Sequence, residues 1–186
     1  QHTYIKSYDR FTKQEVGSER IDEASRIEMH PGKSMIYAIT TNTIPIRMSV
    51  YRIADGQFVE TYTSPYHSDY DLKPDITISP DGKYIFNDAG FVFYAAAQKS
   101  ANMTYAATVE PFSSVAFDLA QGNVYTARDN KVTAYNSTSL QAVKRWAVNG
   151  EIDYITVHDG KIVLLTKEPL DESGMKVPSI QLFDPV

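Results

Sequence analysis

One acidic and aromatic stretch of the chain, residues 64–75, carries the side chains best suited to chemistry. Asp69, Asp71 and Asp75 are hard oxygen donors of the kind that Ca²⁺ binds. Their spacing matches no EF-hand loop, which requires a central glycine and a distal glutamate. The sequence therefore favours a solvated loop, with a Ca²⁺ site as the alternative, and no cofactor is expected.

The same stretch contains a histidine and two tyrosines that suggest two further kinds of site. The imidazole of His67, oriented by Asp69 or Asp71, could act as a general base in hydrolysis. No nucleophile or metal accompanies it, so an inert surface histidine is the favoured interpretation. Tyr66 and Tyr70 have amphipathic rings that supply contact area to a protein or carbohydrate partner. We therefore expect this loop to bind a partner rather than to catalyse a reaction.

The composition of the whole chain narrows its class and its partners. The 186 residues carry a formal net charge of −5, so a broad basic surface for nucleic acid is not expected. Cysteine is absent, which excludes disulfides, thiol nucleophiles and thiolate metal sites. No apolar stretch approaches the roughly 18 residues of a membrane-spanning helix, so no membrane span is expected. The 13 tyrosines and eight phenylalanines suit half-buried strands and indicate an all-β class.

The elements that position these residues repeat along the chain. Four segments share one order of features: an apolar strand, a tight turn, a second strand, a polar loop and a strand with an aromatic residue. The expected turn glycines are Gly32, Gly82, Gly122 and Gly160, which lie about 40 residues apart except for the first pair. Glycine accepts the positive φ angle of a hairpin turn. A period of about 40 residues that holds four strands predicts a β-propeller blade.

The repeat predicts where each strand and each blade lies. First strands are expected at residues 26–29, 75–78, 114–117 and 154–157, and second strands at 35–40, 84–87, 123–127 and 162–166. Third strands are expected at 48–53, 91–95, 131–136 and 179–184, and fourth strands at 58–63, 102–109 and 142–148. The chain then divides into a partial blade at 1–25, blades at 26–72, 73–110 and 111–150, and three strands at 151–186. With the third and fourth strands of the partial blade the count is about 17, one more than the 16 strands of four closed blades, so we expect part of a larger ring whose open edges favour association.

Two short motifs resemble the repeat of the YVTN-type propellers. They are SPDGKYI at residues 79–85 and FVFY at residues 91–94, and weaker copies occur at residues 35–42 and 123–132. The chain departs from the motif at residues 30–32 and 118–123. This superfamily includes lactonase-like, quinoprotein-like and surface-layer proteins, so the resemblance implies the fold and leaves the activity open.

The resemblance also implies which face binds ligands. In such propellers ligands meet the loops that follow each fourth strand and the loops between the second and third strands. Those loops hold His67, Asp69, Tyr70, Asp71, Asp75, Asp88, Arg128, Asp129, Glu168, Asp171 and Glu172. We expect a non-catalytic binding or scaffold propeller, from an exported protein in the extracellular space, the periplasm or at the cell surface. The alternatives are a lactonase-like or quinoprotein-like enzyme with a metal or cofactor at the acidic face, and a structural segment completed by further blades.

Overall fold

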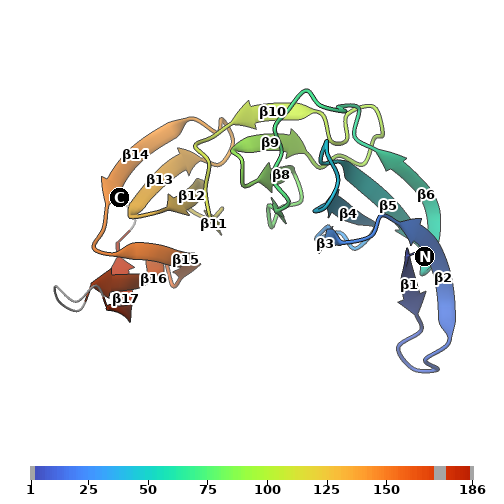
Figure 1. Ribbon diagram of the computed structural model, residues 1–186, viewed down its shortest axis with the longest axis horizontal. Coiled ribbons are helices and arrows are strands. Elements are labelled where there is room, and N and C mark those ends of the chain that lie inside the picture. The colour runs from blue at the N-terminus through green and yellow to red at the C-terminus, as the bar shows by residue number, and fades with distance from the viewer. Residues whose placement is uncertain (1–2, 170–174, 185–186) are drawn as a thin grey trace. The chain divides into compact units, whose positions relative to one another are not determined.

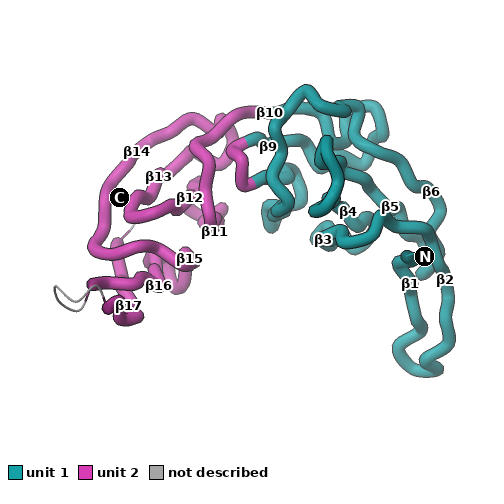
Figure 2. The backbone as a smooth tube through the Cα atoms, viewed as in Figure 1, with its two compact units in different colours: residues 1–87, 91–106 teal, residues 88–90, 107–186 magenta. Residues whose placement is uncertain are grey.

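The computed structural model describes residues 3–169 and 175–184, which contain seventeen β-strands and no α-helix (Figure 1). The all-β class and the four-stranded antiparallel sheets expected from the repeat are confirmed. The described residues contain no helix that is long and apolar enough to cross a bilayer. The chain forms two compact units, residues 1–87 with 91–106 and residues 88–90 with 107–186 (Figure 2).

The first unit holds a hairpin and two sheets. The hairpin pairs β1 (Thr3–Tyr8) with β2 (Glu15–Ile21). The first sheet runs in chain order through β3 (Ser25–Met29), β4 (Met35–Thr40), β5 (Met48–Ala54) and β6 (Gln57–Thr63). The second sheet runs through β7 (Ile76–Ile78), β8 (Tyr84–Asn87), β9 (Phe91–Tyr94) and β10 (Tyr105–Thr108), and the unit boundary falls within β10.

Strand β4 explains how the sheets of the first unit are held together. All six of its residues are buried, because alternate side chains of a strand point to opposite faces of the sheet. On one face Tyr37 and Ile39 join a core with Ile85 and Phe93 of the second sheet. On the other face Ile36 and Ala38 lie in a core that includes residues of the hairpin. The sheet is therefore packed on both sides.

The second unit holds one four-stranded and one three-stranded sheet. The four-stranded sheet runs through β11 (Ser114–Asp118), β12 (Asn123–Arg128), β13 (Lys131–Asn136) and β14 (Ala142–Ala147). The three-stranded sheet runs through β15 (Glu151–His158), β16 (Lys161–Pro169) and β17 (Lys176–Phe183). Ile155, Ile162 and Leu164 of the second sheet pack against Tyr125 and Ala127 of the first.

The tight turns agree with the repeat at three glycines and differ at the fourth. Gly82, Gly122 and Gly160 have φ angles of 70°, 73° and 70°, as a left-handed turn residue requires. At the first turn Gly32 lies within the turn as predicted, but the left-handed residue is the next one, Lys33, with a φ of 58°. The reason is that the hydrogen bond from Lys33 N–H to the His30 carbonyl matches the one from Gly82 N–H to the Ser79 carbonyl, so the turn is offset by one residue.

Candidate functional site

The two tyrosines expected to bind a partner are half-buried and fasten their own loop to the second sheet. Their rings meet edge to face with centroids 4.8 Å apart. The ring of Tyr70 also stacks on Tyr105 at 5.5 Å, and the Tyr66 hydroxyl accepts a hydrogen bond of 3.0 Å from the Tyr105 N–H. Burial raises the pKa of Tyr70. Much of the surface of Tyr66 and Tyr70 is therefore used to hold residues 64–75 in place.

His67 and its neighbouring carboxylates do not form a catalytic pair. The Asp69 carboxylate accepts a hydrogen bond of 3.0 Å from the backbone N–H of His67, so it shapes the loop instead of orienting the imidazole. His67, Asp69 and Asp71 are all exposed. The arrangement lacks the base–carboxylate contact that hydrolysis would need.

Asp75 contacts different residues from Asp69 and Asp71. Its carboxylate pairs with Arg26 across to β3, and its carbonyl accepts a hydrogen bond of 2.7 Å from Asn87. Asn87 also bonds both the N–H and the carbonyl of Lys73, at 3.1 and 2.6 Å. Within residues 3–169 and 175–184, no three His, Asp or Glu side chains lie close enough to hold a metal ion. Asp69, Asp71 and Asp75 are thus not brought together.

In the first unit, the loop between a second and a third strand and the loop after the fourth strand of the same sheet line a common hollow. It has a volume of about 410 Å³ and is bounded by residues 44–46 and 68–72. Ile44 is fully exposed at its rim. Tyr70 and Asp71 are the two predicted site residues among its walls, which are otherwise largely apolar.

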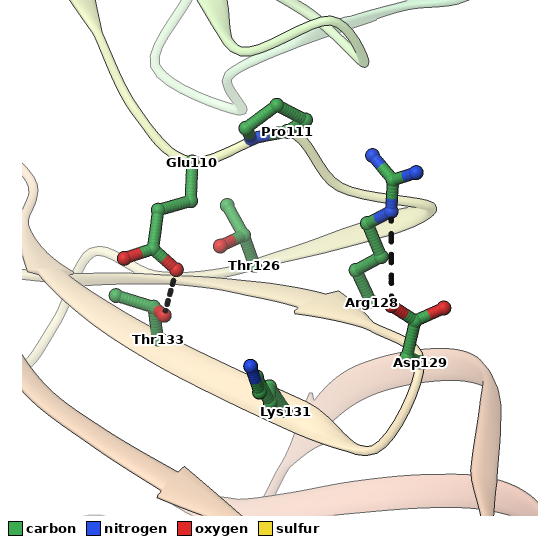
Figure 3. A pocket seen from close by; sticks show the side chains of 7 residues that line it. All are labelled: Glu110, Pro111, Thr126, Arg128, Asp129, Lys131 and Thr133. Atoms are coloured by element: carbon green, nitrogen blue, oxygen red, sulfur yellow. Dashed lines mark hydrogen bonds and ion pairs between the residues drawn. The ribbon is translucent and has the colours of Figure 1, made fainter.

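The corresponding loops of the second unit enclose a polar hollow of about 230 Å³, shown in Figure 3. We call it the cationic hollow, and it is lined by Glu110, Pro111, Thr126, Arg128, Asp129, Lys131 and Thr133. Arg128 and Lys131 end β12 and begin β13, where they pair across the tight turn of Asp129 and Asn130. Asp129 adopts a left-handed φ of 54°, which aspartate tolerates better than most residues.

Glu110 is the fixed anion of the cationic hollow. Its carboxylate accepts a hydrogen bond of 2.6 Å from Arg145 and one of 3.1 Å from the Thr133 hydroxyl. Its backbone N–H donates to the Tyr135 hydroxyl at 2.9 Å. The Arg145 guanidinium holds the pKa of Glu110 below its usual range. Glu110 is therefore charged at neutral pH and already neutralised by Arg145.

The two cations at the turn have bonding capacity to spare. The only ion pair of Arg128 among the described residues is a 4.0 Å contact between its Nε and an Asp129 carboxylate oxygen. Lys131 lines the same hollow, and among the described residues its ammonium makes no hydrogen bond or ion pair within 4.0 Å, although its charge also helps to lower the pKa of Glu110. Thr126 lines the hollow between them and Glu110 (Figure 3). Two such cations beside threonine hydroxyls are suited to a carboxylate or another small anion.

Comparisons with known proteins bear on the fold alone. No protein-family model matches the sequence, and no curated protein does. The computationally designed Ika8 protein is similar with a TM-score of 0.61, at 14% identity over 93% of this chain and 50% of that one. Saccharomyces cerevisiae Sqt1 gives a TM-score of 0.62, at 6% identity over 95% of this chain and 54% of that one. Kuenenia stuttgartiensis hydrazine synthase gives 0.57, at 16% identity over 98% of this chain and 65% of that one.

The described sheets have a propeller-like fold. The chain spans between about half and two thirds of the length of these three structures. Of the residues that the resemblance placed on a loop face, Arg128 and Asp129 line the cationic hollow. The sequence analysis missed Glu110, Lys131 and Thr133, for which the one available signal was a pair of threonines, Thr126 and Thr133, at equivalent places on either side of a tight turn. Of the remaining predicted residues, Asp171 and Glu172 lie outside the described residues.

Replacing Glu110 by glutamine should remove a pH-dependent part of the stability. Because Arg145 lowers the folded-state pKa, the contribution is complete above about pH 4.3, where an unfolded glutamate titrates, and disappears as the pH falls through the folded value. Urea denaturation should show a difference below about 1 kcal/mol at neutral pH, since the pair is half exposed. That difference should shrink in acid, and a difference that does not change with pH contradicts this role.

Proposed function

We propose that this chain is a run of blades from a YVTN-type β-propeller, part of a larger ring in an exported protein, that binds a protein partner without catalysis. The proposal is supported by four-stranded sheets in simple chain order, by apolar cores between successive sheets within each unit, and by the likeness to propeller-like structures. Binding is favoured over hydrolysis because the imidazole of His67 has no carboxylate partner among residues 3–169 and 175–184.

The observation that carries the proposal is the pair of available cations in the cationic hollow. Arg128 and Lys131 stand on two paired strands, beside threonine hydroxyls and the Glu110 carboxylate that Arg145 neutralises, and the second carboxylate, Asp129, meets Arg128 only at 4.0 Å. A partner's aspartate or glutamate would find charge-assisted donors there, and Arg presents them in a fork that matches a carboxylate. The ligand class we propose is therefore an acidic segment of a protein, in preference to a neutral glycan.

The single tryptophan provides a direct test. Trp146 lines a neighbouring hollow together with Lys131, so its fluorescence should change when a ligand reaches Lys131. We expect a hexaglutamate peptide to give a saturable change at low salt that weakens as salt is raised. Replacing both Arg128 and Lys131 by glutamine should weaken the affinity roughly tenfold or more, as loss of charged hydrogen bonds does.

A matched control separates this site from general charge attraction. Lys144 lies on β14 in the same sheet and pairs with Ala134, whereas the Glu110 partner Arg145 pairs with Thr133, so Lys144 points to the opposite face. Lys144→Gln should leave the affinity unchanged, and a hexaglutamine peptide should not bind. Equal weakening by Lys144→Gln, or unchanged binding by the double variant, would refute the proposal.

A further inference from the structure

One face of the three-stranded sheet is apolar and uncovered. Tyr154 pairs with Leu165 and Leu165 with Ile180, while Val163 pairs with Leu182 on the same face. Tyr154, Leu165, Ile180 and Leu182 are 56%, 39%, 68% and 62% exposed. Scattered exposed apolar residues are ordinary, but a contiguous set on one sheet face marks an interaction surface. We call these five residues the apolar face.

The preceding sheet, β11–β14, shows what packs against the equivalent face in this fold. When the sequences of the two sheets are aligned at the turn glycines Gly122 and Gly160, Tyr125 corresponds to Val163 and Ala127 corresponds to Leu165. Their cross-strand partners then also match, because Tyr125 pairs with Ala134 as Val163 does with Leu182, and Ala127 pairs with Val132 as Leu165 does with Ile180. Tyr125, Ala127, Val132 and Ala134 are buried beneath the next sheet. The apolar face therefore corresponds to a face that receives another sheet.

The N-terminal hairpin carries the complementary kind of surface. Asp9 caps its turn by accepting the N–H groups of Phe11 and Thr12, and Asn136 does the same for Thr138 and Ser139. The residue before each cap is a tyrosine, Tyr8 and Tyr135, so these two occupy the same place in the repeat.

Two other tyrosines at the same place in the repeat are buried, and their contacts show which side of the sheet this position faces. Tyr135 is 3% exposed, and its hydroxyl accepts the N–H of Glu110, in the segment that precedes its own sheet. Tyr51, in the corresponding strand β5, is 4% exposed, and its hydroxyl donates to the carbonyl of Arg20 in the preceding hairpin. Tyr8 is 57% exposed. Its face of the hairpin, with Tyr4 beside it, therefore corresponds to the side that meets a preceding sheet.

We propose that the hairpin of a second copy of this chain covers the apolar face and so supplies the next sheet of the larger ring, an inference that rests on the function proposed above. The two surfaces are the two sides of one kind of sheet-to-sheet interface, which the chain already makes within its first unit and again within its second. Both sides are present on every copy, so the contact is head-to-tail and joins faces of sheets rather than strand edges. Tyr8 and Tyr4 are the aromatic anchors on one side, and Ile180 and Leu182 form the centre of the other.

Sedimentation of paired variants tests the arrangement. The wild-type chain should show a mass that rises with concentration above that of the monomer, because every copy carries one surface of each kind. Ile180→Lys damages only the apolar face and Tyr8→Lys only the hairpin, so each variant alone should stay monomeric. A mixture of the two should form a one-to-one dimer and nothing larger, since one intact surface remains on each variant.

The mixture also guards against misfolding, because a variant that fails to fold cannot restore the dimer. Val143→Lys is the matched control, since Val143 is 65% exposed on the outer strand β14 and should not affect the mass. A wild-type chain that stays monomeric at every concentration overturns the proposal and assigns the apolar face to a further sheet of the same repeat. Failure of the mixture to dimerise, or dissociation by Val143→Lys, overturns it as well.

Discussion

Replacing Asn102 by alanine should lower the free energy of unfolding by roughly 3 kcal/mol. Asn102 is 1% exposed and lies between the two sheets of the first unit. Its amide oxygen accepts the Tyr37 hydroxyl at 2.7 Å and the Ala96 N–H at 3.0 Å, and its amide nitrogen donates to the Tyr62 hydroxyl at 3.0 Å. Tyr37 is wholly buried, and burial raises its pKa above the usual range, so its hydroxyl finds no water when Asn102 is lost.

A double-mutant cycle separates this polar junction from simple loss of packing. In a Tyr37→Phe background the buried hydroxyl is already gone, so Asn102→Ala should cost about 1 kcal/mol less than it does in the wild type. Urea denaturation followed by circular dichroism gives all four free energies. Equal costs in both backgrounds would show that the bond between Tyr37 and Asn102 does not join the two sheets.

Replacing Leu164 by alanine should cost about 2 to 5 kcal/mol, the range for a buried leucine in a well-packed core. Leu164 is 0% exposed on β16 and belongs to the core between the two sheets of the second unit, with Ile162 and Ile155 beside it. The lost side chain leaves a cavity that neighbouring strands cannot fill without breaking their pairing. This substitution therefore measures how firmly the two sheets are joined.

The next residue along the same strand is the matched control. Leu165 points to the opposite face and is 39% exposed, so Leu165→Ala should change the free energy of unfolding of the dilute chain by less than about 1 kcal/mol. The same control should weaken self-association in sedimentation, because Leu165 belongs to the apolar face. Similar losses of stability at Leu164 and Leu165 would contradict the sheet-on-sheet packing of the second unit.

Much of the fold could be predicted from the sequence because its signals are local. Gly82, Gly122 and Gly160 mark turns through a backbone conformation that few other residues accept, and the strands follow from the apolar residues on either side. The first turn shows the limit of this signal, since Lys33 takes the left-handed conformation next to a glycine. The fourth strand of the second sheet also begins later than expected, at Tyr105, because Met103 is left-handed and breaks the extended run.

The candidate site was less accessible from the sequence because its contacts join distant residues. Arg145 is 35 residues from Glu110, and Asn102 is 65 residues from Tyr37, so neither pairing leaves a local pattern. Tyr66 and Tyr70 were expected to face a partner because loop tyrosines often do, but aromatic side chains of the second sheet engage them first. Local spacing predicts where a loop lies between strands, and tertiary packing decides which of its side chains remain available.

Binding of an acidic segment at the cationic hollow is tested most directly by mapping backbone amide chemical shifts while hexaglutamate is added to the full chain. We expect the largest changes at Glu110 and residues 126–133, with smaller ones at Arg145 and Trp146, which line a neighbouring hollow with Lys131. The changes should disappear when Arg128 and Lys131 are both replaced by glutamine. Changes centred on residues 44–46 and 68–72 instead, or no changes at a saturating peptide concentration, would contradict the account.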